Sequence, residues 1–404
     1  MAGVTPGTLA RPLQRIQTFK ETVWGTPGLA TSKWMLVEPN PSFTPKYMST
    51  VIDEDRGSFA PGYVAYISEL GGTFSLSQVA SFEDIEYSLS AMMGAVSPTG
   101  GGPYTWTHAA PLSSAYTPQS YTMELSYDIG NVVAKGCLMT KLDIKGNARG
   151  PWTLAQSGFF QQYNPCTAIA IASSTNASPV AVTTATPHGL STGMQVVIIG
   201  HLVNTGANGT WTITVTGASS FTATGSVGNG IGAATGTVTQ TITPGIADRT
   251  VEPVLFAGET TLAIDAAGGT VGTTPVSNAL VSFDMSIDNQ EQGFFTGDQK
   301  YPTDFTQEKF KVTLTLKLKW NAQVKALFNS TLLTGASSLF QIKATSGTKS
   351  CELDFSGVLE SDPAQYQVDY GALTQEFKFG GLVDTGALAN YLKTITINSV
   401  ASLP

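Results

Sequence analysis

Residues 310–320 read Phe-Lys-Val-Thr-Leu-Thr-Leu-Lys-Leu-Lys-Trp, and this stretch decides the fold class. Every even-numbered position is apolar, and every odd-numbered position is Lys or Thr. Side chains alternate between the two sides of a β-strand, so the stretch predicts a strand with one face in a core and one face outside it. The surrounding sequence is rich in Gly, Pro, Thr and Ser, as is typical of many short strands joined by turns.

Similar signals flank this strand on both sides. Asn321 is suited to cap a helix that Gly335 would end, and Ser81 is suited to cap an earlier helix that Gly94 would end. Glu83, Asp84 and Glu86 would place negative charge in the first turn of the earlier helix. Further strands are predicted at 104–108, 121–127, 132–144, 152–160, 280–287, 339–344, 351–355 and 373–379.

The order of these elements suggests an internal duplication. Each half runs strand, capped helix, glycine and further strands. Strand–helix–strand units are also common in unrelated proteins, so a chance likeness remains the alternative. We expect a mainly β fold with two tandem β-sandwich domains, each flanked by one α-helix.

A long uncharged stretch separates the halves. From Gly150 to Ala247 the sequence contains no Asp, Glu, Lys or Arg. Within it, Trp211, Ile213 and Val215 alternate with threonines, which predicts a small inserted β-barrel or sandwich. The expected organisation is an N-terminal arm at 1–60, a first domain at 61–166, the inserted module at 167–243 and a second domain at 244–404.

Composition excludes several classes of function. The formal net charge of −8 disfavours a protein that grips nucleic acid, which normally carries a basic face. The 3 cysteines are too few and too scattered for a disulfide framework or a zinc site. No segment is apolar enough for a signal peptide or a membrane span, so folding in a cytoplasm is expected.

Motifs for catalysis are equally scarce. The 3 histidines, His108, His188 and His201, accompany no nucleophile elbow and no zinc-protease pattern. Lys349, in Gly347-Thr-Lys-Ser350, lacks the glycine spacing of a phosphate loop. We therefore expect no enzymatic activity, no cofactor and no metal.

Two charged groups are candidates for contact between subunits. One is the acidic run Asp53, Glu54 and Asp55 with the adjacent Arg56, and the other is the lysine face Lys311, Lys317 and Lys319 of the long strand. The lysines could pair with an acidic neighbouring subunit, lie in water or contact phosphate. The net acidic charge favours the first two. If the acidic run contacts lysines of another copy, these contacts would determine the register of the two subunits more than the affinity between them.

Several motifs resemble one viral family when they are taken in order. They are Thr26-Pro-Gly28, the run from Arg56 to Gly62, Ser81-Phe-Glu-Asp-Ile85, Gly102-Pro-Tyr-Thr-Trp106 and the run from Val281 to Asp288. Together they resemble the major tail tube proteins of long-tailed bacteriophages. Parts of the insert (186–193, 208–215 and 219–222) are similar to a small β domain named after a region of ubiquitin-activating enzymes, which is often appended to phage structural proteins.

The resemblance implies a structural role in the virion tail, after assembly in the host cytoplasm. Subunits would join edge to edge into rings that stack around a lumen, with long arms and loops reaching between rings. DNA would pass through the lumen without sequence recognition. Three chains with two tube domains each would give a pseudo-sixfold ring, favoured over a hexamer. The partners implied are tape measure, terminator and baseplate proteins, and no membrane. The alternative is another tail component: a terminator, baseplate hub or adhesin.

Overall fold

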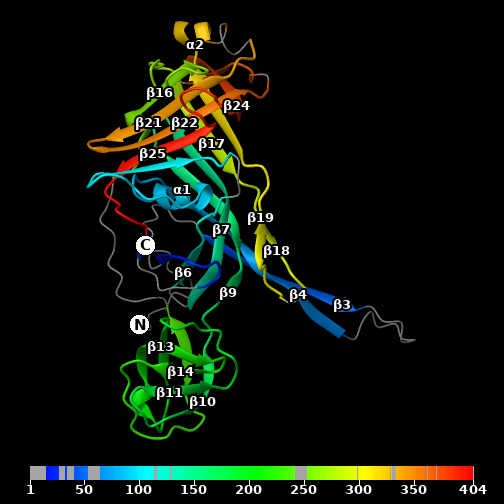
Figure 1. Cartoon of the computed structure of the whole chain (residues 1–404), viewed down its shortest axis with the longest axis vertical. Coiled ribbons are helices and arrows are strands. Elements are labelled where there is room, and N and C mark those ends of the chain that lie inside the picture. The colour runs from blue at the N-terminus through cyan, green and yellow to red at the C-terminus, as the bar shows by residue number, and fades with distance from the viewer. Residues whose placement is uncertain are drawn as a thin grey trace, which may run out of the picture.

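The computed structural model describes residues 15–26, 32–33, 41–52, 64–112, 116–127, 130–241, 253–297, 299–327, 329, 334–361, 363–369 and 371–403. It has an elongated body of antiparallel sheets, a long projecting hairpin and a small barrel at one end (Figure 1). The expected mainly β class with a small barrel module is confirmed. No helix in these described ranges is long and apolar enough to cross a membrane.

Among the described residues, the body contains two α-helices, one 3-10 turn and most of the strands. The strands of the first half are β1 (Arg15–Lys20), β2 (Ser32–Lys33), β3 (Ser42–Ile52), β4 (Val64–Val79), β5 (Tyr104–Ala109), β6 (Tyr121–Tyr127), β7 (Gly130–Asn147), β8 (Thr153–Phe160) and β9 (Gln162–Asn164). Those of the second half are β16 (Thr260–Ala266), β17 (Leu280–Asp288), β18 (Gln292–Phe294), β19 (Asp304–Thr306), β20 (Lys311–Lys319), β21 (Ser338–Ser346), β22 (Lys349–Leu359), β23 (Gln367–Asp369), β24 (Ala372–Gly381) and β25 (Leu392–Asn398). The helices are α1 (Ile85–Met93) and α2 (Ala322–Leu327), and the turn η3 spans Ala257–Glu259.

Strand β7 is the longest strand and joins several parts of the body. Its first part pairs with β6, its middle with β8, and its last residues also pair with β17 of the second half. The halves are also linked by the pairing of β5 with β25. The halves therefore share sheets, and one apolar core runs through both. The division into domains at 61–166 and 244–404 stays a prediction.

The strand at 310–320 behaves as its alternation predicts. Val312, Leu314, Leu316 and Leu318 are buried, and β20 lies between β17 and β24 in the sheet. The second helix also begins as expected, because Asn321 Oδ1 accepts the backbone N–H of Val324 at 2.8 Å. These local patterns are sufficient because the apolar face and the cap are both encoded within a few residues.

Helix α1 differs from its prediction in two ways. Ser81 forms a turn with Asp84, accepting its N–H at 3.0 Å, and the helix itself begins one turn later at Ile85. Every residue of the helix is buried, including the carboxylate-bearing Glu86. Glu86 accepts hydrogen bonds from His108 of β5, at 3.0 Å, and from Thr396 of β25. The helix is enclosed because strands remote in sequence cover the face that an isolated amphipathic helix would turn to water.

The first 60 residues are less irregular than the sequence predicts. Strand β1 pairs with β6 along its whole length, and β3 pairs with β4 over 11 registered positions from Ser42 to Ile52. The buried positions of β1 include the polar Gln17 and Thr18, so the strand lacks the apolar alternation by which a strand is predicted from sequence. Burial of Gln17 is tolerated because its amide donates to Glu124 at 3.0 Å.

The uncharged insert folds as a closed six-stranded barrel. Its strands are β10 (Ile169–Ser174), β11 (Val180–Thr184), β12 (Gln195–Ile199), β13 (Gly209–Gly217), β14 (Ser220–Ala223) and β15 (Thr237–Thr241), with the 3-10 turn η2 at Thr205–Ala207. Ile213 of β13 is buried in a separate core that also holds Phe221 and Val196. Because the barrel has its own core and closes on itself, it leaves no open sheet edge.

We expect deletion of 167–243 to leave the body folded. The two ends of the barrel lie together, because its first strand β10 pairs with its last strand β15, and Asn164 of β9, just before the barrel, donates to Gln240 at 2.7 Å; a short connection could therefore replace the whole module. Thermal unfolding of the deletion variant should retain the body transition near its original temperature. Loss of that transition would show that the barrel is part of the body's stability.

Candidate subunit interface

The projecting hairpin of β3 and β4 is anchored in the body by aromatic side chains. At its base, Phe43 stacks on Phe74 with ring centroids 6.1 Å apart and packs on Phe160 at 6.2 Å. On the body side, β4 also pairs with β8, and this pairing ends where Gly72 lies opposite Phe160. The rest of the hairpin extends from the body as two strands (Figure 1).

This outer part, which we call the hairpin arm (residues 46–52 and 64–70), exposes several large apolar side chains. The exposed ones are Tyr47, Met48, Val51, Ile52, Tyr66 and Ile67, with exposures from 41% to 59%. A bulge between Met48 and Ser49 shifts the register, and both faces of the arm are open. No strand of the described residues pairs with the outer edge of β3. An isolated two-stranded ribbon is marginal in water, so such an arm indicates an interaction site.

A second, shorter hairpin lies at the root of the arm. It consists of β18 and β19, and the carbonyl oxygen of Lys300 accepts the backbone N–H of Leu70 at 2.8 Å. Trp24 packs edge-on against Phe305 of this hairpin, with ring centroids 5.7 Å apart. The N-terminal segment, the arm and the second half of the chain therefore meet at one place and fix the direction of the arm.

The acidic candidates lie outside the described residues. Asp53, Glu54, Asp55 and Arg56 follow Ile52, the last described residue of β3. Their role in subunit contact stays a prediction. The residues that sequence reasoning missed are the apolar ones of the arm. A run of strand-forming residues at 47–52 and again at 64–67, either side of an acidic segment, was the available signal of a hairpin.

The lysine candidates share one face of β20 but have different surroundings. Lys317 is held within the chain, because its ammonium lies 2.5 Å from Asp369 and 3.0 Å from Gln367 of β23. Lys319, at one end of the strand, is exposed. Lys311, at the other end, lines a cavity. The three lysines therefore do not form one compact patch.

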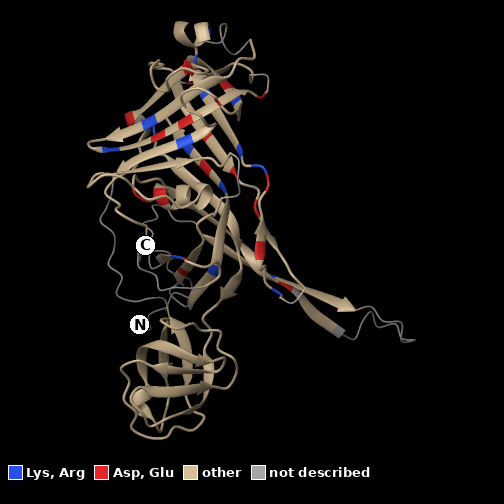
Figure 2. Cartoon of the chain, viewed as in Figure 1, with Lys and Arg blue, Asp and Glu red and all other residues tan. Residues whose placement is uncertain are grey.

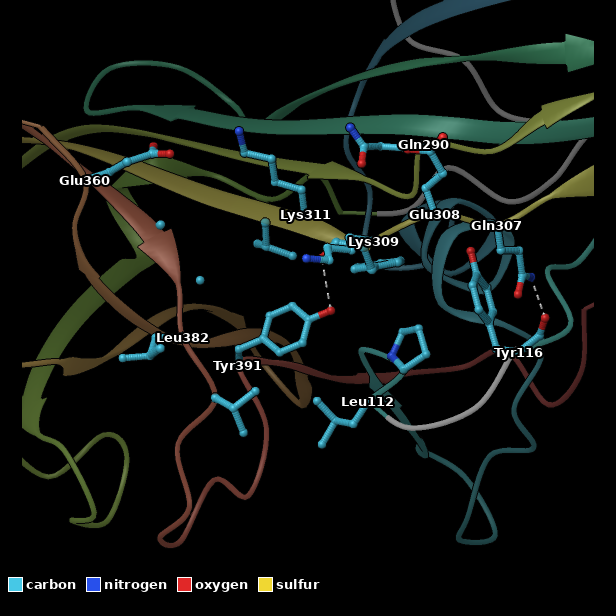
Figure 3. A pocket seen from close by; sticks show the side chains of 16 residues that line it. Leu112, Tyr116, Gln290, Gln307, Glu308, Lys309, Lys311, Glu360, Leu382 and Tyr391 are labelled. Carbon is cyan, nitrogen blue, oxygen red and sulfur yellow. Dashed lines mark hydrogen bonds between the residues drawn. The ribbon is translucent and has the colours of Figure 1, made fainter.

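This cavity, about 880 Å³, lies between β20, β24 and the segment around Tyr116 (Figure 3). Its walls mix aromatic rings with charged groups of both signs, including Lys309, Lys311 and Glu360. Tyr391 donates to the carbonyl oxygen of Phe310 at 3.3 Å, which fixes one wall. An open trough of this composition suits a polypeptide segment better than a reaction that needs a general acid and base at one point.

A buried carboxylate lies where β17 leads into the second hairpin. Glu291 is 3% exposed and accepts a hydrogen bond from the Tyr116 hydroxyl at 2.9 Å. The same hydroxyl accepts from the Asn289 amide at 2.9 Å. Burial raises the pKa of Glu291 to about 7, against an ordinary value of 4.5. The charged carboxylate is thus disfavoured in the fold.

We expect Glu291→Gln to stabilise the protein at pH 8 by about 2–3 kcal/mol and to change stability little at pH 4.5. A carboxyl whose pKa is raised by folding binds its proton more tightly in the folded state. Glu291 therefore lowers the free energy of unfolding increasingly as pH rises from about 4.5 to 7, and the full loss is reached above that range. Urea unfolding of both proteins across this range measures the difference. A stability gap independent of pH would contradict the assignment.

The charge distribution of the surface follows the architecture. Lys, Arg, Asp and Glu are spread over the body, and the barrel has none (Figure 2). Among the described residues, no group of three or more His, Cys, Asp or Glu is placed to hold a metal ion. Comparison with known families and with curated proteins finds no match for this chain.

Proposed function

We propose that this chain is the structural subunit of a bacteriophage tail tube, which polymerises as stacked rings around a lumen for DNA. The hairpin arm carries the proposal. It presents large apolar side chains on a projecting ribbon, and β3 pairs with no strand other than β4 among the described residues, so a neighbouring copy could cover both the side chains and this strand. The motif resemblance supplies the identity of the assembly.

The topology supports a ring of three chains. In each half a hairpin precedes a helix: β3 and β4 precede α1, and β17 and β20, with the smaller hairpin between them, precede α2. Strands of the two halves already join edge to edge inside one chain, through β7 and β17. Repeating such a junction between chains would close a threefold ring with pseudo-sixfold symmetry.

The electrostatics support a conduit that does not retain DNA. The protein carries a net charge of −8, and phosphate groups would find little attraction on such a surface. This proposal includes no enzymatic step. The tape measure, terminator and baseplate proteins would contact the ends of the tube, and the assembled protein would reside in the virion tail.

Negative-stain electron microscopy of the purified full-length protein tests the proposal. We expect rings or hollow filaments with threefold averages that show six similar wall units. Protein that remains monomeric at all concentrations would refute a tube subunit. Isolated rings that never stack would favour a terminator over a tube subunit.

A further inference from the structure

A polar cavity of about 330 Å³ lies where the barrel meets the body. Body residues of β7 and β9 form one side of it, and the barrel contributes β15 and the loop at 186–190. This cavity is separate from the trough at β20, and neither the hairpin arm nor the resemblance accounts for it.

The cavity is lined by a buried lysine side chain. Lys135 of β7 is 5% exposed, and its Nζ donates to the carbonyl oxygen of Gly189 in the barrel loop at 3.3 Å. Glu21, whose charge is felt at this position, is itself held by Ser120, Thr122 and the N–H of Gly136 at 2.7 to 2.9 Å. Burial lowers the pKa of Lys135, and Glu21 offsets this only in part.

A second donor faces the cavity from the barrel side. Asn164 accepts the N–H of Cys166 through Oδ1 at 3.0 Å, so its Nδ2 must be the group that donates to Gln240 at 2.7 Å. Gln240 therefore uses its Oε1 in this contact and keeps its Nε2 protons for another acceptor. Gln240 is 4% exposed and lines the cavity.

The remaining walls supply donors and no negative charge. Gln162 and Tyr301 add an amide and a hydroxyl, and none of the described residues that line the cavity is Asp or Glu. His188 is turned to the barrel, because its Nδ1 accepts the N–H of Leu190 at 3.0 Å. A buried cation and the remaining amide donor of Gln240, in walls without a carboxylate, form an environment suited to an anion.

We propose that this cavity binds a small oxyanion, a phosphate or a carboxylate, held between Lys135 of the body and Gln240 of the barrel. Because the donors come from both parts, the bound anion stabilises the junction between them. The site needs no assembly partner, so the proposal does not depend on the function proposed above.

Isothermal titration of the full-length protein with inorganic phosphate at constant ionic strength tests the site directly. We expect saturable binding with a Kd below about 10 mM. Acetate, titrated separately, distinguishes a phosphate site from a carboxylate site, and binding of either supports the proposal. Absence of saturable binding for both anions below that concentration overturns it.

Two substitutions locate the binding. Lys135→Met keeps the length of the side chain and removes the charge, so the protein should fold and binding should weaken at least tenfold. Gln240→Glu keeps the acceptor for Asn164 and replaces the remaining donor with a negative oxygen in the cavity that Lys135 also lines. This variant should also lose binding.

The matched control is Lys325→Met, at an exposed position of α2, which lies at the end of the body opposite the barrel (Figure 1). Binding by this variant should equal that of the unmodified protein. If Lys135→Met binds phosphate or acetate as tightly as the control does, the anion lies elsewhere and the proposed site is wrong.

Discussion

A protein with Val51→Asp and Ile67→Asp together is expected to lose polymerisation, with the association constant reduced about 100-fold or more. Both side chains are on the hairpin arm, with exposures of 58% and 41%, and neither supports the body core. In the proposed assembly each would be buried against a neighbour. Burying an unpaired carboxylate there costs at least about 1–2 kcal/mol per site, which accounts for the size of the effect.

Light scattering and negative-stain microscopy measure this loss, and circular dichroism confirms that the variant is folded. The matched control carries Val227→Asp and Ile231→Asp, which are exposed by 63% and 79% on the barrel. It adds the same number of charges to aliphatic positions that are more exposed than those of the arm, and it should still assemble. Polymerisation of the arm variant at the normal concentration would remove the arm from the interface.

Replacing Glu86 by alanine is expected to lower the free energy of unfolding by about 3–5 kcal/mol. The carboxylate is fully buried, lies 3.0 Å from His108 and also receives the hydroxyl of Thr396. Its removal leaves two buried polar partners without an acceptor and a cavity beside them. Because His108 and Thr396 belong to different halves of the chain, the loss affects the whole body.

Urea unfolding of the unassembled protein measures this change. Glu352→Ala is the control, since Glu352 pairs with Lys343 at 2.9 Å near the surface, and its loss should cost about 1 kcal/mol or less. Glu86→Gln, which keeps an acceptor for Thr396, should lie between the two. Equal stability of the two alanine variants would show that the buried pair contributes no more than a surface pair.

The sequence predicts the parts of the fold in which local chemistry and burial agree. Strand β20 and its following cap at Asn321 are examples, because their signals lie within a few adjacent residues. Strand β25 was not predicted, and its pattern explains why. Its buried face carries Thr394, Thr396 and Asn398, and its isoleucines lie on the half-buried face. The polar face is buried because it binds α1 and the turn before it: Thr396 meets Glu86, and Asn398 donates to Phe82.

The candidate interface was predictable only in part for a related reason. Charged residues are easily recognised in a sequence, so Lys311, Lys317 and Lys319 are the candidates for subunit contact that the sequence offers. The structure uses Lys317 inside the chain, and the exposed apolar residues gather on the arm. Exposure of Tyr47 or Val51 depends on where the hairpin leaves the body, and no local pattern encodes that position. The cavity between barrel and body could not be predicted from the sequence either, since Lys135 and Gln240 come to line one cavity only through the fold.

The pairing of β5 with β25 also has a consequence during synthesis on the ribosome. Trp106, a residue of this junction, donates to the carbonyl oxygen of Val400 across 294 residues of sequence. The first half therefore leaves the exit tunnel long before its last partner strand exists. The barrel, contiguous in sequence, can close on its own in the meantime. Completion of the body waits for β25, so a chain that lacks this strand would have a finished barrel and an open, aggregation-prone sheet.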